Sequence, residues 1–236
     1  MILGGLRTFT EYQSCAPAIG PGEMHFLQSH VLGPGAIVDV GANMGAVSIT
    51  LARRFPDRRL LSIEANPTTC AQLRRSAEAN GCINIGVRDV AVADRIGEIW
   101  FATDTGSSAT CHISEGGAAG NLRVKCTTLS GLVEEEAIDR VALLKVDVEG
   151  YELPVFRGAA DLIRDGLVSV VYFEVCPAVA VAAGFDPAAA AEFLAERGFS
   201  LFRIQQNGGL VPTDPSAASA VELENWVAVF NRPASR

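Results

Sequence analysis

The sequence predicts a doubly wound α/β domain with a mostly parallel sheet of about seven strands. Short apolar runs alternate with helix-like segments from residue 36 onward, and the first two of these runs end beside acidic residues. The 236-residue chain is also 49% hydrophobic, which is enough for a buried core. Alternation of this kind is typical of strand–helix–strand crossovers, which build parallel sheets covered by helices.

Seven apolar segments are the predicted strands of this sheet. In chain order they are Ala36–Val40, Leu60–Ile63, Ile83–Val87, Val141–Val146, Val168–Val175, Phe199–Ile204 and Trp226–Phe230. The fifth is apolar almost throughout, as expected for a strand covered on both faces. Asn207-Gly208-Gly209 is a turn signal, and we expect it to join the last two strands.

Helices are predicted between these strands: Ala46–Arg54, a second from Pro67, a third from about Tyr151 to Arg164, and a fourth from Asp186-Pro187 to Gly198. The second has the clearest boundaries. Asn66 is a favourable N-cap, Pro67 suits the first helical position, and Gly81 can end the helix in the left-handed conformation.

Two segments interrupt this alternation. Residues 1–32 are predicted to be an irregular extension with a short helix around Met24–Val31, so that the domain itself spans residues 33–236. Residues 94–135 are predicted to be an insertion, in which strand-like Glu98–Ala102 and Leu122–Thr127 flank the small-residue-rich Thr103–Asn121. We expect this last stretch to be a lid or mobile loop on the substrate side.

Composition bears on partners and location. The net charge of −8 argues against nucleic acid, whose phosphates favour a basic face. The sequence contains neither an apolar run long enough to span a membrane nor a recognisable signal peptide. The six cysteines form no C-x-x-C pair, which favours reduced thiols. A cytoplasmic protein acting on a small molecule is the expectation.

The sharpest motif is I-V-D-V-G-A-N-M-G, from Ile37 to Gly45. A strand ends, glycine permits a tight turn, and the free N–H groups of a following helix can hold an anionic or polar ligand. A dinucleotide fingerprint would place a second glycine where Asn43 stands. Asp39 would lie close to a diphosphate, so it suits a cationic group instead, such as the amino group of a methionine moiety.

Glu64 ends the second predicted strand, 23 positions after Gly41. An acid near this offset typically accepts hydrogen bonds from both hydroxyls of a ribose. The glycine turn and Glu64 together predict an adenosine-type ligand.

The third motif is L-L-K-V-D-V-E-G-Y-E, from Leu143 to Glu152. Lys145, Asp147 and Glu149 alternate, so they would project to one side if the strand stayed extended. Such charges at the carboxyl end of a parallel strand indicate a functional site. The alternative is a Lys–Asp ion pair of purely structural value. Glu174 lies likewise near the end of the fifth strand.

These motifs in this order, with E-A-N-P after the second strand, D-V-A-V-A-D at 89–94 and a later F-E-V, resemble the FkbM-type methyltransferases from about Gly33 to Phe230. The resemblance implies a class I methyltransferase (Rossmann-like) fold, with an antiparallel last strand and S-adenosyl-L-methionine bound above the first strand. Within that resemblance, each part of the cofactor has its own residues: Asp39, Gly41, Asn43 and Gly45 for methionine, Glu64 for ribose, and Asp89 and Val90 for adenine.

The resemblance also implies methylation of a hydroxyl on a sugar or another natural product. Asp147 is the first candidate for the base that takes the hydroxyl proton, and Lys145 would tune its charge. Glu174 would act as a second acid. A divalent metal held by Asp147 and Glu174 is not favoured, because only two acids are in register. His112 is a weaker candidate base from the predicted loop.

Three alternatives stay open. A nicotinamide-dependent oxidoreductase could use the same sheet, although Asp39 and Asn43 argue against it. A binding protein could keep the cofactor pocket without catalysis, although the charges at 145–149 favour an enzyme. The acceptor could also be nitrogen, because the sequence does not identify the substrate.

Overall fold

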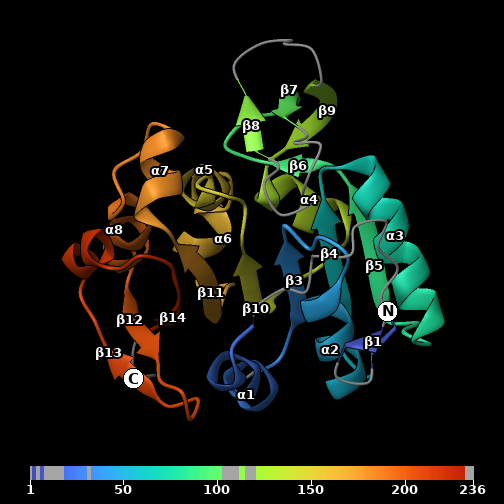
Figure 1. Cartoon of the computed structure of the whole chain (residues 1–236), viewed down its shortest axis with the longest axis horizontal. Coiled ribbons are helices and arrows are strands. Elements are labelled where there is room, and N and C mark those ends of the chain that lie inside the picture. The colour runs from blue at the N-terminus through green and yellow to red at the C-terminus, as the bar shows by residue number, and fades with distance from the viewer. Residues whose placement is uncertain are drawn as a thin grey trace.

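An eight-stranded sheet forms the centre of the molecule (Figure 1). The computed structural model describes residues 2–3, 6–7, 19–30, 33–102, 112–114 and 121–231, with side chains for 19–30, 33–100 and 122–231. In spatial order the strands are β13 (Leu210–Pro212), β12 (Phe199–Ile204), β14 (Glu224–Phe230), β11 (Val170–Val175), β10 (Val141–Val146), β3 (Ala36–Val40), β4 (Leu60–Glu64) and β5 (Ile85–Asp89).

Strand direction confirms the predicted fold class. The strands β5, β4, β3, β10 and β11 form parallel pairs, and β14 is antiparallel to both β11 and β12. The antiparallel strands therefore lie at the C-terminal end of the sheet. In the sheet, β14 lies between β11 and β12, although it is the last strand in the chain.

The turn at Asn207-Gly208-Gly209 corrects one predicted connection. It joins β12 to β13, which pair antiparallel, and does not lead directly into β14. Gly208 has a φ of +82°, and the N–H of Gln205 donates to the carbonyl of Gly209 at 2.8 Å. The three-residue β13 was not predicted, because Leu210-Val211-Pro212 is too short to show an alternating pattern.

The third predicted strand begins two residues late. Ile83 is 99% exposed, and the strand β5 starts at Ile85. The Asn84 side chain instead donates to the carbonyls of Ala52, Phe55 and Arg58. These bonds fix the connection before the strand.

Helices cover both faces of the sheet. They are α1 (Pro21–Ser29), α2 (Ala46–Arg54), α3 (Pro67–Ala79), α4 (Leu129–Glu135), α5 (Glu152–Gly158), α6 (Ala160–Arg164), α7 (Pro177–Ala182) and α8 (Ala189–Ala195), with a 3₁₀ turn at Pro215–Ala220. Phe26 of α1 and Leu51 of α2 pack with Ile37 on one face. Phe156 of α5 and Leu194 of α8 pack on the other, with Val38. In Figure 1, α1 and α2 lie toward the bottom of the view, and α5 and α6 lie to the left of β10.

The predicted boundaries hold for α3 but not for the helix expected from Tyr151 to Arg164. The Asn66 side chain accepts from the N–H groups of Thr68 and Thr69, and Gly81 has a φ of +65°, as predicted. The helix expected from Tyr151 to Arg164 is divided into α5 and α6. At this division Gly158 lies against the backbone of Ala93, whose carbonyl oxygen a Cβ would meet at 2.1 Å.

The N-terminal helix starts earlier than predicted. Pro21 begins α1, and the Glu23 carboxylate accepts from the N–H of Gly20 at 2.7 Å, which caps the helix. Within residues 1–32 the structure also describes β1 (Ile2–Leu3) and β2 (Leu6–Arg7), which form an antiparallel pair, and the residues directly flanking α1. The proposed division at residue 33 stays a prediction.

A second, four-stranded sheet is built from the predicted insertion together with the two residues of β6 that precede it. Its order is β6 (Ala91–Val92), β9 (Asn121–Thr127), β7 (Gly97–Ala102) and β8 (His112–Ser114), and it lies at the top of Figure 1. The two predicted strands correspond to β7 and β9. The lid expected at Thr103–Asn121 lies outside the described residues except for 112–114 and 121. No helix in the described part of the chain is long and apolar enough to cross a membrane.

Candidate active site

Strand register brings the predicted site residues to one edge of the main sheet. Asp39 of β3 lies opposite Lys145 of β10, and Glu64 of β4 lies opposite Asp89 of β5. Glu174 lies near the end of β11, which is parallel to β10. Because these strands are parallel, their carboxyl ends share the crevice edge where α/β proteins bind ligands.

The glycine turn after β3 has little room for side chains. Gly41 and Gly45 have φ angles of +75° and +87°, and Asn43 adopts +50°. A Cβ at Gly41 would meet the carbonyl oxygen of Asp147 at 1.8 Å, and one at Gly45 would meet Leu73 at 2.1 Å. The turn therefore fits closely against the end of β10 and against α3 only because both positions are glycine.

Glu64 holds this turn in place. Its two carboxylate oxygens accept from the backbone N–H groups of Asn43, at 2.9 Å, and Asn66, at 2.8 Å. Burial raises the pKa of Glu64 to about 7, against the opposing effect of these two hydrogen bonds. A carboxylate has about four acceptor positions, so Glu64 keeps capacity for further donors.

Asp39 is fully buried beside a cation of the protein itself. Lys145 Nζ lies 2.9 Å from Asp39 Oδ1, as an ion pair without an aligned hydrogen bond, and the Ser48 hydroxyl donates to Oδ2 at 2.6 Å. The sequence predicted a cationic group of a ligand beside Asp39, whereas the cation that lies beside it here is the protein's own Lys145. Contact with a ligand amino group stays a prediction.

Lys145 contacts both the glycine turn after β3 and the acid that follows β10. Its ammonium group donates to the carbonyl of Gly41 at 3.2 Å and lies 3.5 Å from Asp147 Oδ2. Burial by itself lowers the pKa of Lys145, but the carboxylates of Asp39 and Asp147 outweigh this effect and hold the pKa above its usual range. The two carboxylates therefore favour the protonated form of Lys145.

The predicted alternation of charges ends at Asp147. Lys145 and Asp147 do lie together, but β10 ends at Val146, and Glu149 and Gly150 have φ angles of +54° and +89°. The chain turns there because Glu152 Oε1 accepts from the N–H groups of Val148 and Gly150. Glu149 is consequently part of a turn and does not continue an extended strand.

Several carboxylates near Asp147 have raised pKa values. Burial raises the pKa of Glu149 to about 7, and the negative charge of Asp147 adds to the effect. Burial likewise raises the pKa of Glu174 to about 8, helped by Asp147 and Glu149, whereas Lys145 lowers it. Carboxyl groups with pKa values near neutrality are suited to proton transfer.

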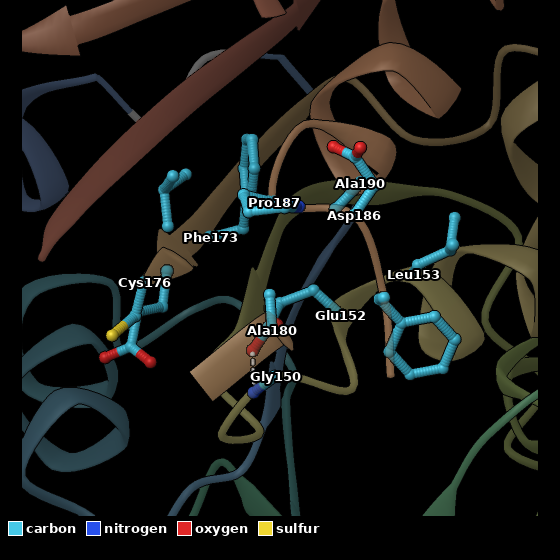
Figure 2. A pocket seen from close by; sticks show the side chains of 12 residues that line it. Gly150, Glu152, Leu153, Phe173, Cys176, Ala180, Asp186, Pro187 and Ala190 are labelled. Atoms are coloured by element: carbon cyan, nitrogen blue, oxygen red, sulfur yellow. Dashed lines mark hydrogen bonds between the residues drawn. The ribbon is translucent and has the colours of Figure 1, made fainter. Parts of the chain in front are cut away.

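A hollow opens beside these acids (Figure 2). It lies between the end of β11 and the helices α7 and α8, and Figure 2 shows Glu152, Cys176 and Asp186 around it. Its wall is completed by Gly150, Leu153, Phe173, Glu174, Val175, Ala180, Phe185, Pro187 and Ala190. Its wall therefore combines apolar side chains with the carboxylates of Glu152, Glu174 and Asp186.

The family of the chain follows from its similarity to known proteins. The model of the Methyltransferase FkbM domain matches residues 39–201, more than half of the chain. The chain belongs to the FkbM methyltransferase family. It is therefore a methyltransferase, and the predicted family is confirmed.

Two curated relatives of this FkbM protein are fungal methyltransferases. "Methyltransferase 1" of Beauveria bassiana (strain ARSEF 2860) is 27% identical over 186 residues, which cover 70% of this chain and 72% of the relative. "Methyltransferase sdnD" of Sordaria araneosa is 28% identical over 155 residues, which cover 52% of this chain and 59% of the relative.

Solved structures share the FkbM protein's fold. A precorrin-6y C5,15-methyltransferase from Geobacter metallireducens GS-15 has a TM-score of 0.51 at 12% identity, covering 96% of this chain and 93% of that one. An O-methyltransferase from Bacillus cereus in complex with SAH has a TM-score of 0.50 at 14% identity, covering 92% and 82%. At these identities the likeness shows the class I methyltransferase fold alone.

Not every predicted residue joins the central cluster of the FkbM site. Asp89 is exposed at the end of β5, beside Glu64, and the half-buried Val90 packs against the main core. The backbone of His112 lies in β8, but its side chain is outside the described part of the chain. Among the described residues, no group of three or more His, Cys, Asp or Glu side chains could hold a metal ion.

Sequence reasoning missed two sets of site residues. Ser48 and Ser62 join Asp39, with 2.7 Å between their hydroxyl oxygens. The alternation of Ser62 and Glu64 in a buried strand was the available signal. Glu23 accepts from the side-chain amide of Asn225 at 2.7 Å, and the buried Tyr172 also hydrogen-bonds to Glu23. These last contacts join α1 to β11 and β14, which local sequence does not reveal.

Proposed function

We propose that this FkbM protein transfers a methyl group from S-adenosyl-L-methionine to a hydroxyl oxygen of a small molecule. One observation carries the proposal: the Gly41–Gly45 turn and the acids Asp147 and Glu174 meet at the same edge of the sheet. A cofactor site and a proton acceptor side by side are what such a transfer requires.

The residues around the turn fit the cofactor. Gly41, Asn43 and Gly45 form the turn that leads into the first turn of α2, and this is where we place the methionine part. Glu64 has acceptor capacity for ribose hydroxyls, and Asp89 and Val90 are at the neighbouring strand end for adenine. Once bound, S-adenosyl-L-methionine supplies a methyl group on a positively charged sulfur.

The acids support a hydroxyl acceptor over a nitrogen one. A hydroxyl must lose its proton, whereas a neutral amine attacks through its lone pair and needs no base beforehand. Asp147 is the proposed base, because its side chain is 38% exposed at the carboxyl end of β10. Glu174, with a pKa of about 8, is the second acid that can receive the proton as pH rises.

Lys145 acts in this proposal by position. It is buried and held protonated, so it does not accept the proton itself. The net charge of −8 supports a small-molecule acceptor over nucleic acid. A sugar or another natural product is the class that we propose.

Asp147→Asn and Glu174→Gln test the assignment, because both changes keep side-chain size. We expect Asp147→Asn to reduce turnover by about 10²–10⁴-fold, while calorimetry finds the affinity for S-adenosyl-L-methionine nearly unchanged. Glu174→Gln should flatten the rise of activity toward pH 8. Activity is followed as a mass gain of about 14 Da, one CH₂, on hydroxylated metabolites.

Cofactor titrations separate the alternatives. Binding of a nicotinamide cofactor in place of S-adenosyl-L-methionine would contradict the proposal and favour an oxidoreductase. Full turnover by Asp147→Asn would refute its role as base. Methylation of amines but of no alcohol would replace the oxygen acceptor by nitrogen.

A further inference from the structure

A chain of buried polar side chains runs beneath α2 and crosses three strands. It starts at Ser62 on β4, continues through Ser48 on α2 to Asp39 on β3, and reaches Lys145 on β10. Successive atoms are 2.7, 2.6 and 2.9 Å apart, and all four residues are buried. Lys145 then contacts Asp147, whose side chain is partly exposed.

Burying this series of polar and charged side chains costs desolvation free energy. Removing two charges from water costs several kcal/mol per ion, and close pairing with further hydrogen bonds is needed to offset it. Replacing buried ion pairs by well-packed apolar residues is often neutral or stabilising in proteins. The arrangement therefore calls for a function other than stability.

The contacts of Lys145 indicate that function. The same ammonium group donates to the carbonyl of Gly41, in the cofactor turn, and lies beside the carboxylate of Asp147, the proposed base. Asp39 pairs with the same ammonium, and the Ser48 hydroxyl donates to the other oxygen of Asp39, so the ammonium is tied to a buried carboxylate that is itself hydrogen-bonded.

We propose that Lys145, held by Asp39 and Ser48, is a positioning residue that fixes the cofactor turn and the Asp147 carboxylate relative to each other. In this arrangement Asp39 is the counterion of Lys145 and acts on the cofactor through it. The inference rests on the proposed function, because it assigns Asp147 to the reaction.

Neutralising the buried pair tests the proposal. The double variant Asp39→Asn/Lys145→Met removes both charges together and so leaves no unpaired buried ion. We expect its kcat to fall about 10²-fold, the loss associated with a misplacement of about 1 Å, while its affinity for S-adenosyl-L-methionine changes less than about 3-fold. An equal fall in cofactor affinity would instead indicate a general collapse of the site and overturn the proposal.

Ser48→Ala provides a milder variant that keeps every charge. It removes the donor to Asp39 Oδ2, and we expect a smaller loss of kcat with unchanged cofactor affinity. Thr50→Val is the matched control on the same helix. The Thr50 hydroxyl donates to the carbonyl of Ala46 and is not part of the buried series from Ser62 to Lys145. Equal kcat values for the two variants would exclude a positioning role for Ser48.

Hydrogen–deuterium exchange gives a readout that does not depend on turnover. In the wild type, S-adenosyl-L-methionine should slow exchange both at residues 41–45 and at residues 147–150. In the double variant it should slow exchange only at residues 41–45. If residues 147–150 are protected equally in the variant and in the wild type, this inference alone is overturned. If the wild-type protein does not bind S-adenosyl-L-methionine, the proposed function is overturned.

Discussion

Replacing Gly41 by alanine would place a methyl group 1.8 Å from the carbonyl oxygen of Asp147. Contacts of a Cβ below 3.0 Å do not persist, so the turn and the end of β10 must separate by about 1.2 Å, which is 3.0 less 1.8 Å. The φ of +75° adds a cost of about 1–2 kcal/mol for any residue with a Cβ. With about 1–3 kcal/mol for overpacking, we expect the free energy of unfolding to fall by about 2–5 kcal/mol.

The same displacement should also impair function. It moves the cofactor turn away from Asp147, and a shift of about 1 Å can cost about 10²-fold in rate. Urea denaturation measures the stability, calorimetry measures the affinity for S-adenosyl-L-methionine, and the methylation assay measures turnover.

Gly81→Ala is the matched control. Gly81 has a similar φ of +65°, but no atom lies within 4 Å of the added Cβ. This variant should lose about 1–2 kcal/mol and keep full cofactor affinity. If the two variants lost equal stability and both kept their activity, the close approach of the turn to β10 would have no energetic consequence, and the reasoning would be refuted.

Three further changes test separate features. Asn66→Ala removes the N-cap of α3 and should lower the free energy of unfolding by about 1 kcal/mol; an unchanged denaturation midpoint would contradict this. Burial raises the pKa of Glu149 to about 7, so the folded state binds more protons than the unfolded state and stability falls as pH rises from about 4.5 through about 7. Glu149→Gln should reduce this fall in urea denaturation, and an unaltered slope would refute it. A Cβ at Gly22 would meet the carbonyl oxygen of Gln205 at 2.1 Å, so Gly22→Ala should cost about 1–3 kcal/mol and speed proteolysis at α1; wild-type resistance would show that α1 can shift freely.

Local patterns were sufficient for most of the main sheet. Apolar runs located its longer strands, and the Asn66-Pro67 pair and Gly81 bounded α3 correctly. The boundaries failed where side chains outside the segment decide them, as with the amide of Asn84 before β5. The helix division near Gly158 likewise coincides with a close approach to Ala93, which lies 65 residues earlier in the chain.

The sequence by itself determined the fold class, the glycine turn and the acids at the strand ends, because these follow from periodicity and from the residue types at fixed spacings. Only the tertiary structure decided which partners these groups have. Asp39 pairs with Lys145, which lies 106 residues later in the chain. Pairing between such distant residues depends on strand order and register, and no local pattern specifies either of them.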